Sequence, residues 1–185
     1  MPDLHLNDQS PPELLAQMGL KAFQAQDLQK AKECFQAARE GFTNSGNSTK
    51  AAEMANNLSV ILLKNGDAKA ALQIADGTDK IFAEASDPQR QAMAFGNQGA
   101  ALEALGQLKD ALIVYQKSSD LLKQTGDKEN RSIVLASISQ IEMRMGQPLE
   151  AMVSMQISLD NRPKLSFREK LLNKLLKVPF KFLGH

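Results

Sequence analysis

An alanine recurs at every fortieth position along most of this 185-residue chain. The four alanines are Ala31, Ala71, Ala111 and Ala151, and no insertion separates the copies around them. Copies in strict register indicate a repeat architecture, in which each unit is one supersecondary element stacked on the next. The fold can therefore be derived from a single 40-residue unit.

Each copy has the pattern of two helices separated by a short break. A glycine stands five residues before three of the four alanines, at Gly66, Gly106 and Gly146, and Gln26 takes this place in the first copy. Glycine is favoured just after a helix because the chain turns there through a left-handed backbone conformation. Apolar residues of segment 108–123 share one helical face. No segment alternates apolar and polar residues over a strand length, so the sequence predicts an all-α fold.

The recurring alanine has a mechanical explanation. Two antiparallel helices joined by a tight turn approach closely only where their side chains are small. Larger residues follow four positions later at Phe35, Tyr115 and Met155. We expect them to fill the interface between one helix pair and the next. One helix pair cannot bury its apolar surface alone, so the copies are expected to stack into a solenoid.

Two segments carry signals for helix ends. Ser10, followed by two prolines and Glu13, predicts a serine cap on the first helix. Ser166 and Glu169 have the spacing of a capping box, and Pro179 is expected to end the helix that follows.

Composition argues against several functional classes. Twenty-two Lys and Arg residues balance 21 Asp and Glu residues, so no global electrostatic attraction to nucleic acid is expected. A single cysteine, Cys34, cannot form an internal disulfide or a cysteine-based zinc site. The two histidines, His5 and His185, lie near the ends of the chain, and no phosphate-binding loop or catalytic motif is present. We therefore expect a non-catalytic protein without cofactor or metal.

The cellular location is predicted from the lack of a signal-peptide pattern and of long apolar runs in the sequence. Residues 1–10 contain no basic region followed by an apolar run, and no run of roughly 18 apolar residues occurs anywhere. We expect a cytoplasmic protein, with a peripheral position at a membrane left open by the C-terminal segment considered below.

At the repeated positions the chain resembles the tetratricopeptide repeat family. The third copy matches at Gly99, Leu102, Gly106, Leu108, Ala111 and Tyr115. The period is 40 residues rather than the usual 34 or so, which resembles the kinesin-light-chain and G-protein-signalling-modulator repeats. The resemblance implies a right-handed α-solenoid of four helix–turn–helix repeats over 11–163. An extension at 1–10 would precede it, and a basic amphipathic helix and tail at 164–185 would follow.

The resemblance also implies a peptide-binding groove on a concave wall built from the first helix of each repeat. The expected groove residues are Gln17, Asn57, Val60, Lys64, Met93, Asn97, Ala100, Ser137, Gln140 and Arg144. Four of them share one position at 40-residue spacing: Gln17, Asn57, Asn97 and Ser137. A carboxamide offers both a donor and an acceptor to a peptide backbone. Two interpretations remain open, contact with a partner and bracing of neighbouring helices.

The last 25 residues carry seven basic residues and one acidic residue. Four leucines cluster on one helical arc: Leu171, Leu172, Leu175 and Leu176. Three lysines face the other way, Lys170, Lys174 and Lys177, and two aromatic residues follow, Phe180 and Phe182. Three interpretations remain open: a helix capping the last repeat, a helix on an anionic membrane, and a segment for partner binding or self-association.

The sequence thus predicts a small adaptor or scaffold that binds a peptide segment of a partner protein in its groove. The alternative function is a membrane-associated assembly or targeting factor, docked through the basic C-terminal helix.

Overall fold

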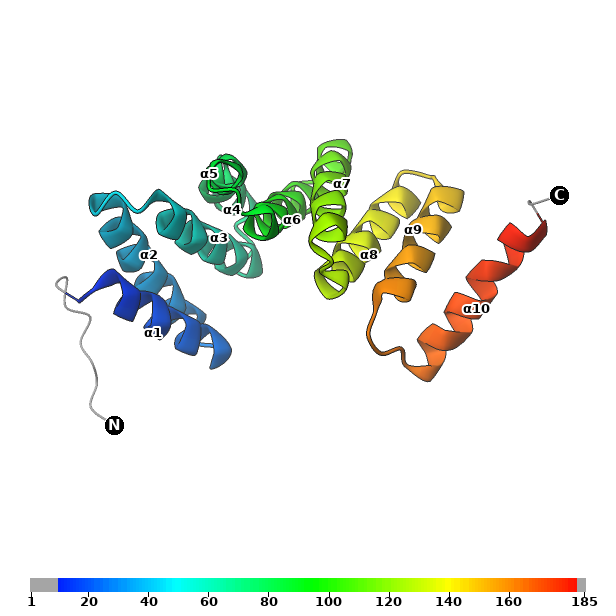
Figure 1. Cartoon of the computed structure of the whole chain (residues 1–185), viewed down its shortest axis with the longest axis horizontal. Helices are drawn as coiled ribbons and strands as arrows, with labels where there is room; N and C mark the ends of the chain where they lie inside the picture. The colour runs from blue at the N-terminus through cyan, green and yellow to red at the C-terminus, as the bar shows by residue number, and fades with distance from the viewer. Residues whose placement is uncertain (1–9, 183–185) are drawn as a thin grey trace.

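The computed structural model describes residues 10–182, and the side chains of residues 10–177. Within this range the chain is helical, with no strand, and forms an elongated array of stacked helices (Figure 1). The helices, in order, are α1 (Pro12–Gln24), α2 (Leu28–Asn44), α3 (Ser48–Lys64), α4 (Ala68–Ala75), α5 (Thr78–Glu84), α6 (Pro88–Ala104), α7 (Leu108–Thr125), α8 (Lys128–Arg144), α9 (Pro148–Asn161) and α10 (Phe167–Phe182). The predicted all-α solenoid is confirmed.

The repeated small residues lie where helices meet. All four recurring alanines are buried. The first helix also contributes a small residue, and the aromatic residue of the second helix packs on it. A Cβ atom added to Gly99 would lie 2.7 Å from Cδ1 of Tyr115, and one added to Gly19 would lie 2.7 Å from Cδ1 of Phe35. The 40-residue period therefore reflects a repeated close approach between paired helices.

Hydrogen bonds repeat with the same period. The hydroxyl of Ser118 in α7 donates to the carbonyl of Ala92 in α6 at 2.7 Å. Forty residues later, the hydroxyl of Ser158 in α9 donates to the carbonyl of Ser132 in α8 at 2.7 Å. Both serines are fully buried, so each bond satisfies a hydroxyl that would be costly to leave unpaired.

The second helix of copy two is interrupted, which corrects the expectation of one helix. Gly77 adopts a left-handed φ of 75° between α4 and α5. The break leaves the carbonyl of Ala75 free to accept from the Thr78 hydroxyl at 2.7 Å and from Gln98 Nε2, in α6, at 3.0 Å. Because Gln98 comes from the next repeat, tertiary contact stabilises a break that helical periodicity alone did not reveal.

The turns between paired helices follow the glycine pattern. Gly66, Gly106 and Gly146 have φ values of 83°, 75° and 75°. Gln26, which replaces glycine in the first copy, has a φ of 62°. A residue with a Cβ atom is strained in this conformation by about 1–2 kcal/mol.

Replacing Gln26 with glycine should therefore stabilise the protein by about 0.5–1 kcal/mol, since glycine relieves the strain but adds chain entropy to the unfolded state. The denaturant midpoint should rise. The reciprocal change, Gly106→Gln, should lower it; a decrease for both variants would contradict the strain argument.

The helix-end predictions have mixed outcomes. Helix α1 begins at Pro12, and its N-cap residue Pro11 makes no side-chain capping bond, so the predicted Ser10 cap is wrong. Pro12 favours the start of the helix instead, because a proline at the first helical position has a helical φ and no N–H that needs a partner. The capping box at α10 is confirmed: the Ser166 N–H donates to Glu169 Oε2 at 2.8 Å, and the Glu169 N–H donates to Ser166 Oγ at 3.3 Å.

Pro179 does not end the last helix, contrary to expectation, since α10 continues to Phe182. A proline inside a helix removes one main-chain hydrogen bond and clashes with the preceding turn, which a kinked helix accommodates.

Candidate functional site

The first helices of the repeats, α1, α3, α6 and α8, form what we call the first-helix wall. A cavity of about 130 Å³ opens between α1, α2 and α3. Its lining residues are Leu20, Phe23, Phe35, Asn57 and Val60. Two predicted groove residues, Asn57 and Val60, thus lie together and are half-buried.

A larger cavity of about 290 Å³ opens between α6, α7 and α8. It brings together four predicted groove residues, Met93, Asn97, Ala100 and Ser137. Among the other lining residues, the sequence prediction did not include Ile133, which is 58% exposed. Its signal was present in the sequence, because Ile133 stands 40 residues after Met93.

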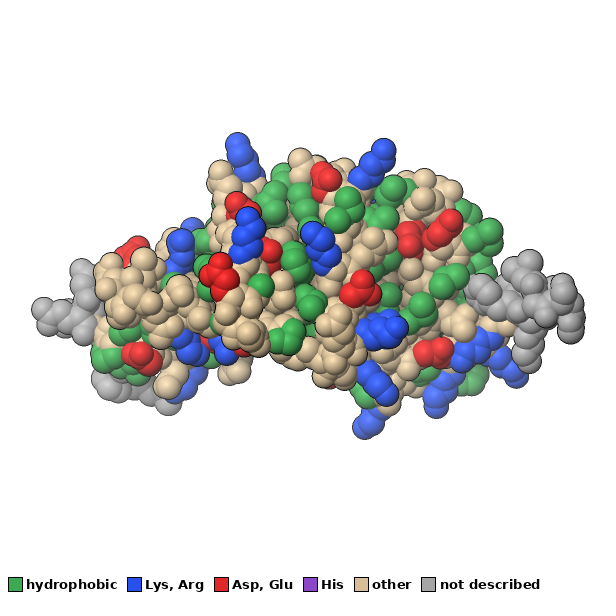
Figure 2. Space-filling model, turned by 45° about the horizontal axis from the view of Figure 1, so that its top comes forward, with side chains coloured by type: hydrophobic (Ala, Val, Ile, Leu, Met, Phe, Trp, Pro, Cys, Tyr) green, Lys and Arg blue, Asp and Glu red, His purple; other side chains and the backbone are tan. Residues whose placement is uncertain are grey.

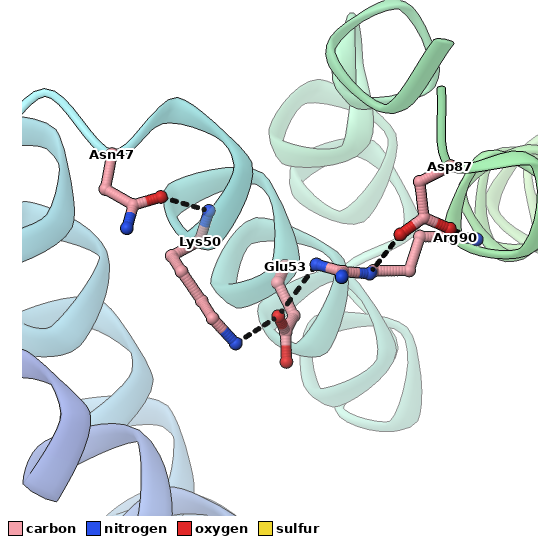
Figure 3. A network of polar contacts seen from close by, with 5 residues as sticks. All are labelled: Asn47, Lys50, Glu53, Asp87 and Arg90. Carbon is pink, nitrogen blue, oxygen red and sulfur yellow. Dashed lines mark hydrogen bonds and ion pairs between the residues drawn. The ribbon is translucent and has the colours of Figure 1, made fainter. Parts of the chain in front are cut away.

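The equivalent position in α3 is charged. Glu53 Oε2 lies 3.0 Å from Lys50 Nζ and 3.3 Å from Arg90 Nη1, and Arg90 Nε lies 2.7 Å from Asp87 Oδ2 (Figure 3). These contacts join α3 to α6 across the repeat boundary. The first-helix wall is therefore ionic at this boundary and apolar at the cavity around Met93 and Ile133.

Asn97 takes part in bracing as well as in lining the cavity. Its Nδ2 atom donates to the carbonyl of Asn56 in α3 at 3.4 Å, which is long for a hydrogen bond. This contact supports the bracing interpretation for Asn97, while Asn57 lines the smaller cavity. Partner contact by either residue stays a prediction.

Four predicted groove residues lie outside these two cavities and are exposed: Gln17, Lys64, Gln140 and Arg144. Lys64 Nζ lies 5.5 Å from the centre of the Phe23 ring. Arg144 Nη1 lies 3.2 Å from Glu103 Oε1, an exposed ion pair that contributes little to stability.

Tyr115 is one of the residues that line the larger cavity. Its hydroxyl donates to Glu103 Oε2 at 3.3 Å. Burial, together with the neighbouring Glu103 carboxylate, raises the pKa of Tyr115 to about 12, although the Ser137 hydroxyl acts in the opposite direction. The Tyr115 phenol is therefore neutral at physiological pH.

The chain has one tyrosine and no tryptophan, so ultraviolet absorbance reports Tyr115 alone. A pH titration should show phenolate formation near pH 12, and Glu103→Gln should move the transition to lower pH. Because the folded pKa is raised, the contribution of Tyr115 to stability is complete below pH 10 and is lost as the pH rises towards 12. A transition at pH 10 in the folded protein would contradict the burial of this hydroxyl.

Helix α10 contacts the solenoid through a narrow strip. Leu176 is 8% exposed, and Asp160 of α9 accepts hydrogen bonds from Asn173 Nδ2 at 2.9 Å and from Lys177 Nζ at 3.0 Å. These bonds lower the pKa of Asp160, with Asn173 as the larger influence. Arg162, at the C-terminal end of α9, also forms an ion pair with Glu169 in the first turn of α10. Two ion pairs and one buried leucine therefore hold α10 to α9.

The opposite side of α10 is apolar and exposed. Phe167 is 83% exposed, Leu171 52% and Leu175 58%, and Leu172 is 41% exposed towards the edge of this face. The flanking cations Lys170 and Lys174 are exposed as well. In the space-filling view, basic and hydrophobic side chains lie side by side at this end of the molecule (Figure 2). The side chains of Phe180 and Phe182 lie outside the described residues.

The capping interpretation of the tail required four leucines to pack on the last repeat, and the structure corrects it. Only Leu176 of the four is buried. Leu172 lies towards the edge of the contact, whereas Leu171 and Leu175 project away from α9, because they lie about 100° or more around the helix from Leu176. A simple cap does not account for α10.

No group of three or more metal-ligating side chains gathers in the part of the chain described. Within residues 10–182, no helix combines the length and the apolar character needed to cross a membrane.

Comparison with known proteins shows the fold. No family model and no curated protein matches the sequence. Among solved structures, the putative kinesin light chain with nearly identical TPR-like repeats from Podospora anserina is 12% identical, with a TM-score of 0.65 over 96% of this chain and 99% of that chain. A double mutant of MamA (RS-1, ArsTM) is 22% identical, with a TM-score of 0.64 over 85% of this chain and 77% of that chain. The protein therefore has the fold of the tetratricopeptide-like helical repeat proteins.

Proposed function

We propose that the protein is a non-catalytic adaptor that binds an extended or helical segment of a partner protein on its first-helix wall. The observation that carries the proposal is the cavity between α6, α7 and α8. Two of its apolar lining side chains, Met93 and Ile133, are about half exposed to solvent. Exposed apolar side chains at the edge of a concavity are typical of a binding site.

The polar residues around this cavity would orient the partner. Asn97 and Ser137 can each donate and accept hydrogen bonds at the cavity edge. An apolar side chain of the partner would enter between Met93 and Ile133, while its main chain pairs with the polar residues. The ionic cluster around Glu53 would select the charge of the partner segment that lies towards α3.

A library of random peptides selected on the protein would test this proposal. Enriched peptides should share a large apolar residue, and the double variant Met93→Gln/Ile133→Gln should weaken their binding about ten-fold or more. Ile113→Gln, which changes an exposed isoleucine of α7 outside this cavity, should leave binding unchanged. Equal affinity for all three proteins would place binding elsewhere.

A second candidate function rests on α10. We propose that its outward face docks the protein on an anionic membrane surface. Phe167, Leu171 and Leu175 would enter the interface, while Lys170 and Lys174 attract acidic headgroups. Co-sedimentation with vesicles tests this proposal.

A further inference from the structure

A cleft of about 350 Å³ lies on the face of α8 opposite Ile133, bounded by α7 and α9. Its lining includes Asp120, Arg131, Leu135, Ile138, Glu142 and Ser154. None of these residues lines the cavity around Met93 and Ile133. The cleft is therefore a separate concavity that the proposed groove does not use.

Glu142 is the unexplained group in this cleft. The residue is 7% exposed, and its Oε2 atom is enclosed without a hydrogen-bond partner in the described structure. Arg131 Nε is also enclosed without a partner. The two residues lie 11 positions apart on α8, about 16 Å along the helix axis, which is too far for the side chains to pair. A buried carboxylate oxygen that accepts no hydrogen bond is costly unless another molecule supplies a donor.

The surroundings of Glu142 favour a cation. Burial raises the pKa of its carboxyl, Glu150 raises it further by charge repulsion, and the Ser154 hydroxyl opposes both. An ammonium group brought next to Glu142 would supply a donor to Oε2, in addition to the Ser154 hydroxyl, and offset the repulsion from Glu150. The neighbouring Leu135 and Ile138 are buried and apolar, which suits the methylene chain of an alkylammonium.

We propose that this cleft binds an alkylammonium group, with the nitrogen donating to Glu142 and the alkyl chain packed on Leu135 and Ile138. Two sources have this chemistry, the lysine side chain of a peptide and a free aliphatic diamine. In the peptide case, Arg131 at the far end of the cleft has an unpartnered N–H for a main-chain carbonyl.

The test uses three probes with the full chain: acetyl-Gly-Gly-Lys-Gly-Gly-amide, the same peptide with norleucine in place of lysine, and 1,5-diaminopentane. Calorimetry should show that the lysine peptide or the diamine binds about ten-fold or more tightly than the norleucine peptide. The tighter of the two cationic probes identifies the source. Glu142→Gln should weaken binding by a similar factor, and Glu129→Gln, which removes an exposed carboxylate from the same helix, should not.

Two further measurements separate this site from a structural role and from the groove. Free Glu142→Gln protein should melt at the same or a higher temperature, because the change removes a buried charge. The double variant Met93→Gln/Ile133→Gln should retain the binding. The proposal is overturned if Glu142→Gln melts at a lower temperature, if it binds like the parent, or if the norleucine peptide binds equally well.

Discussion

Replacing Gly99 with valine should lower the free energy of unfolding by about 3 kcal/mol, at the upper end of the cost of overpacking a core. A Cβ atom at this position would lie 2.7 Å, 2.8 Å and 2.9 Å from three ring atoms of Tyr115. The ring is buried and its hydroxyl is bonded to Glu103, so it has little freedom to withdraw. Urea denaturation followed by circular dichroism would measure the loss.

Gly96 provides a matched control in the same helix. A Cβ atom there would meet only Ser118 Oγ, at an ordinary 3.6 Å. Gly96→Ala should therefore stabilise the helix by about 0.5–1 kcal/mol, through the higher helix propensity of alanine. Gly99→Ala has the same intrinsic gain but should destabilise the protein.

The second copy suggests a compensating pair. Ser59 and Ala75 occupy the positions equivalent to Gly99 and Tyr115, and both are buried. The double variant Gly99→Ser/Tyr115→Ala should lose less stability than the sum of the two single changes, because the ring that clashes with the new side chain is already removed. If the losses of unfolding free energy are strictly additive, positions 99 and 115 are not coupled and the proposed clash is wrong.

The second large effect concerns α10. The protein should co-sediment with vesicles rich in phosphatidylserine at low salt, and Lys170→Gln/Lys174→Gln should weaken this binding about thirty-fold, given about 1 kcal/mol for each lysine near an anionic surface. Leu171→Gln/Leu175→Gln should abolish it, since the outward apolar face is lost. Added salt should release the parent protein.

A charge-matched variant separates docking from general attraction. Lys109→Gln/Lys123→Gln removes the same charge from exposed positions of α7 and should bind vesicles like the parent. Neither α10 variant alters Leu176 or Lys177, which hold α10 to α9, so the melting temperature should be preserved. A parent protein that stays in solution with anionic vesicles at low salt would exclude the membrane role. The outward face of α10 would then be open to a protein partner or to a second copy.

The candidate groove could be predicted in part. The tetratricopeptide resemblance assigned the groove to the first helices, and four of the predicted residues, Met93, Asn97, Ala100 and Ser137, line one cavity in the structure. The 40-residue period points to Ile133 as well, because it stands in the fourth copy at the position that Met93 has in the third. Glu142 could not have been found this way, since an enclosed carboxylate has the same sequence pattern as a solvated one.

The sequence by itself determined the helical pairs, their register and the close approach within each pair, because these depend on local spacing and residue size. Small residues such as Ala111 and Gly99 allow this close approach by their size alone, whatever lies around the helix pair. Only the tertiary structure decided the break at Gly77 and the direction of the apolar face of α10. The break depends on Gln98 from the next repeat, and the direction depends on Asp160, which holds Lys177 and Asn173 towards α9. Amphipathic spacing shows that a helix has two faces, but the neighbour it meets determines which face is buried.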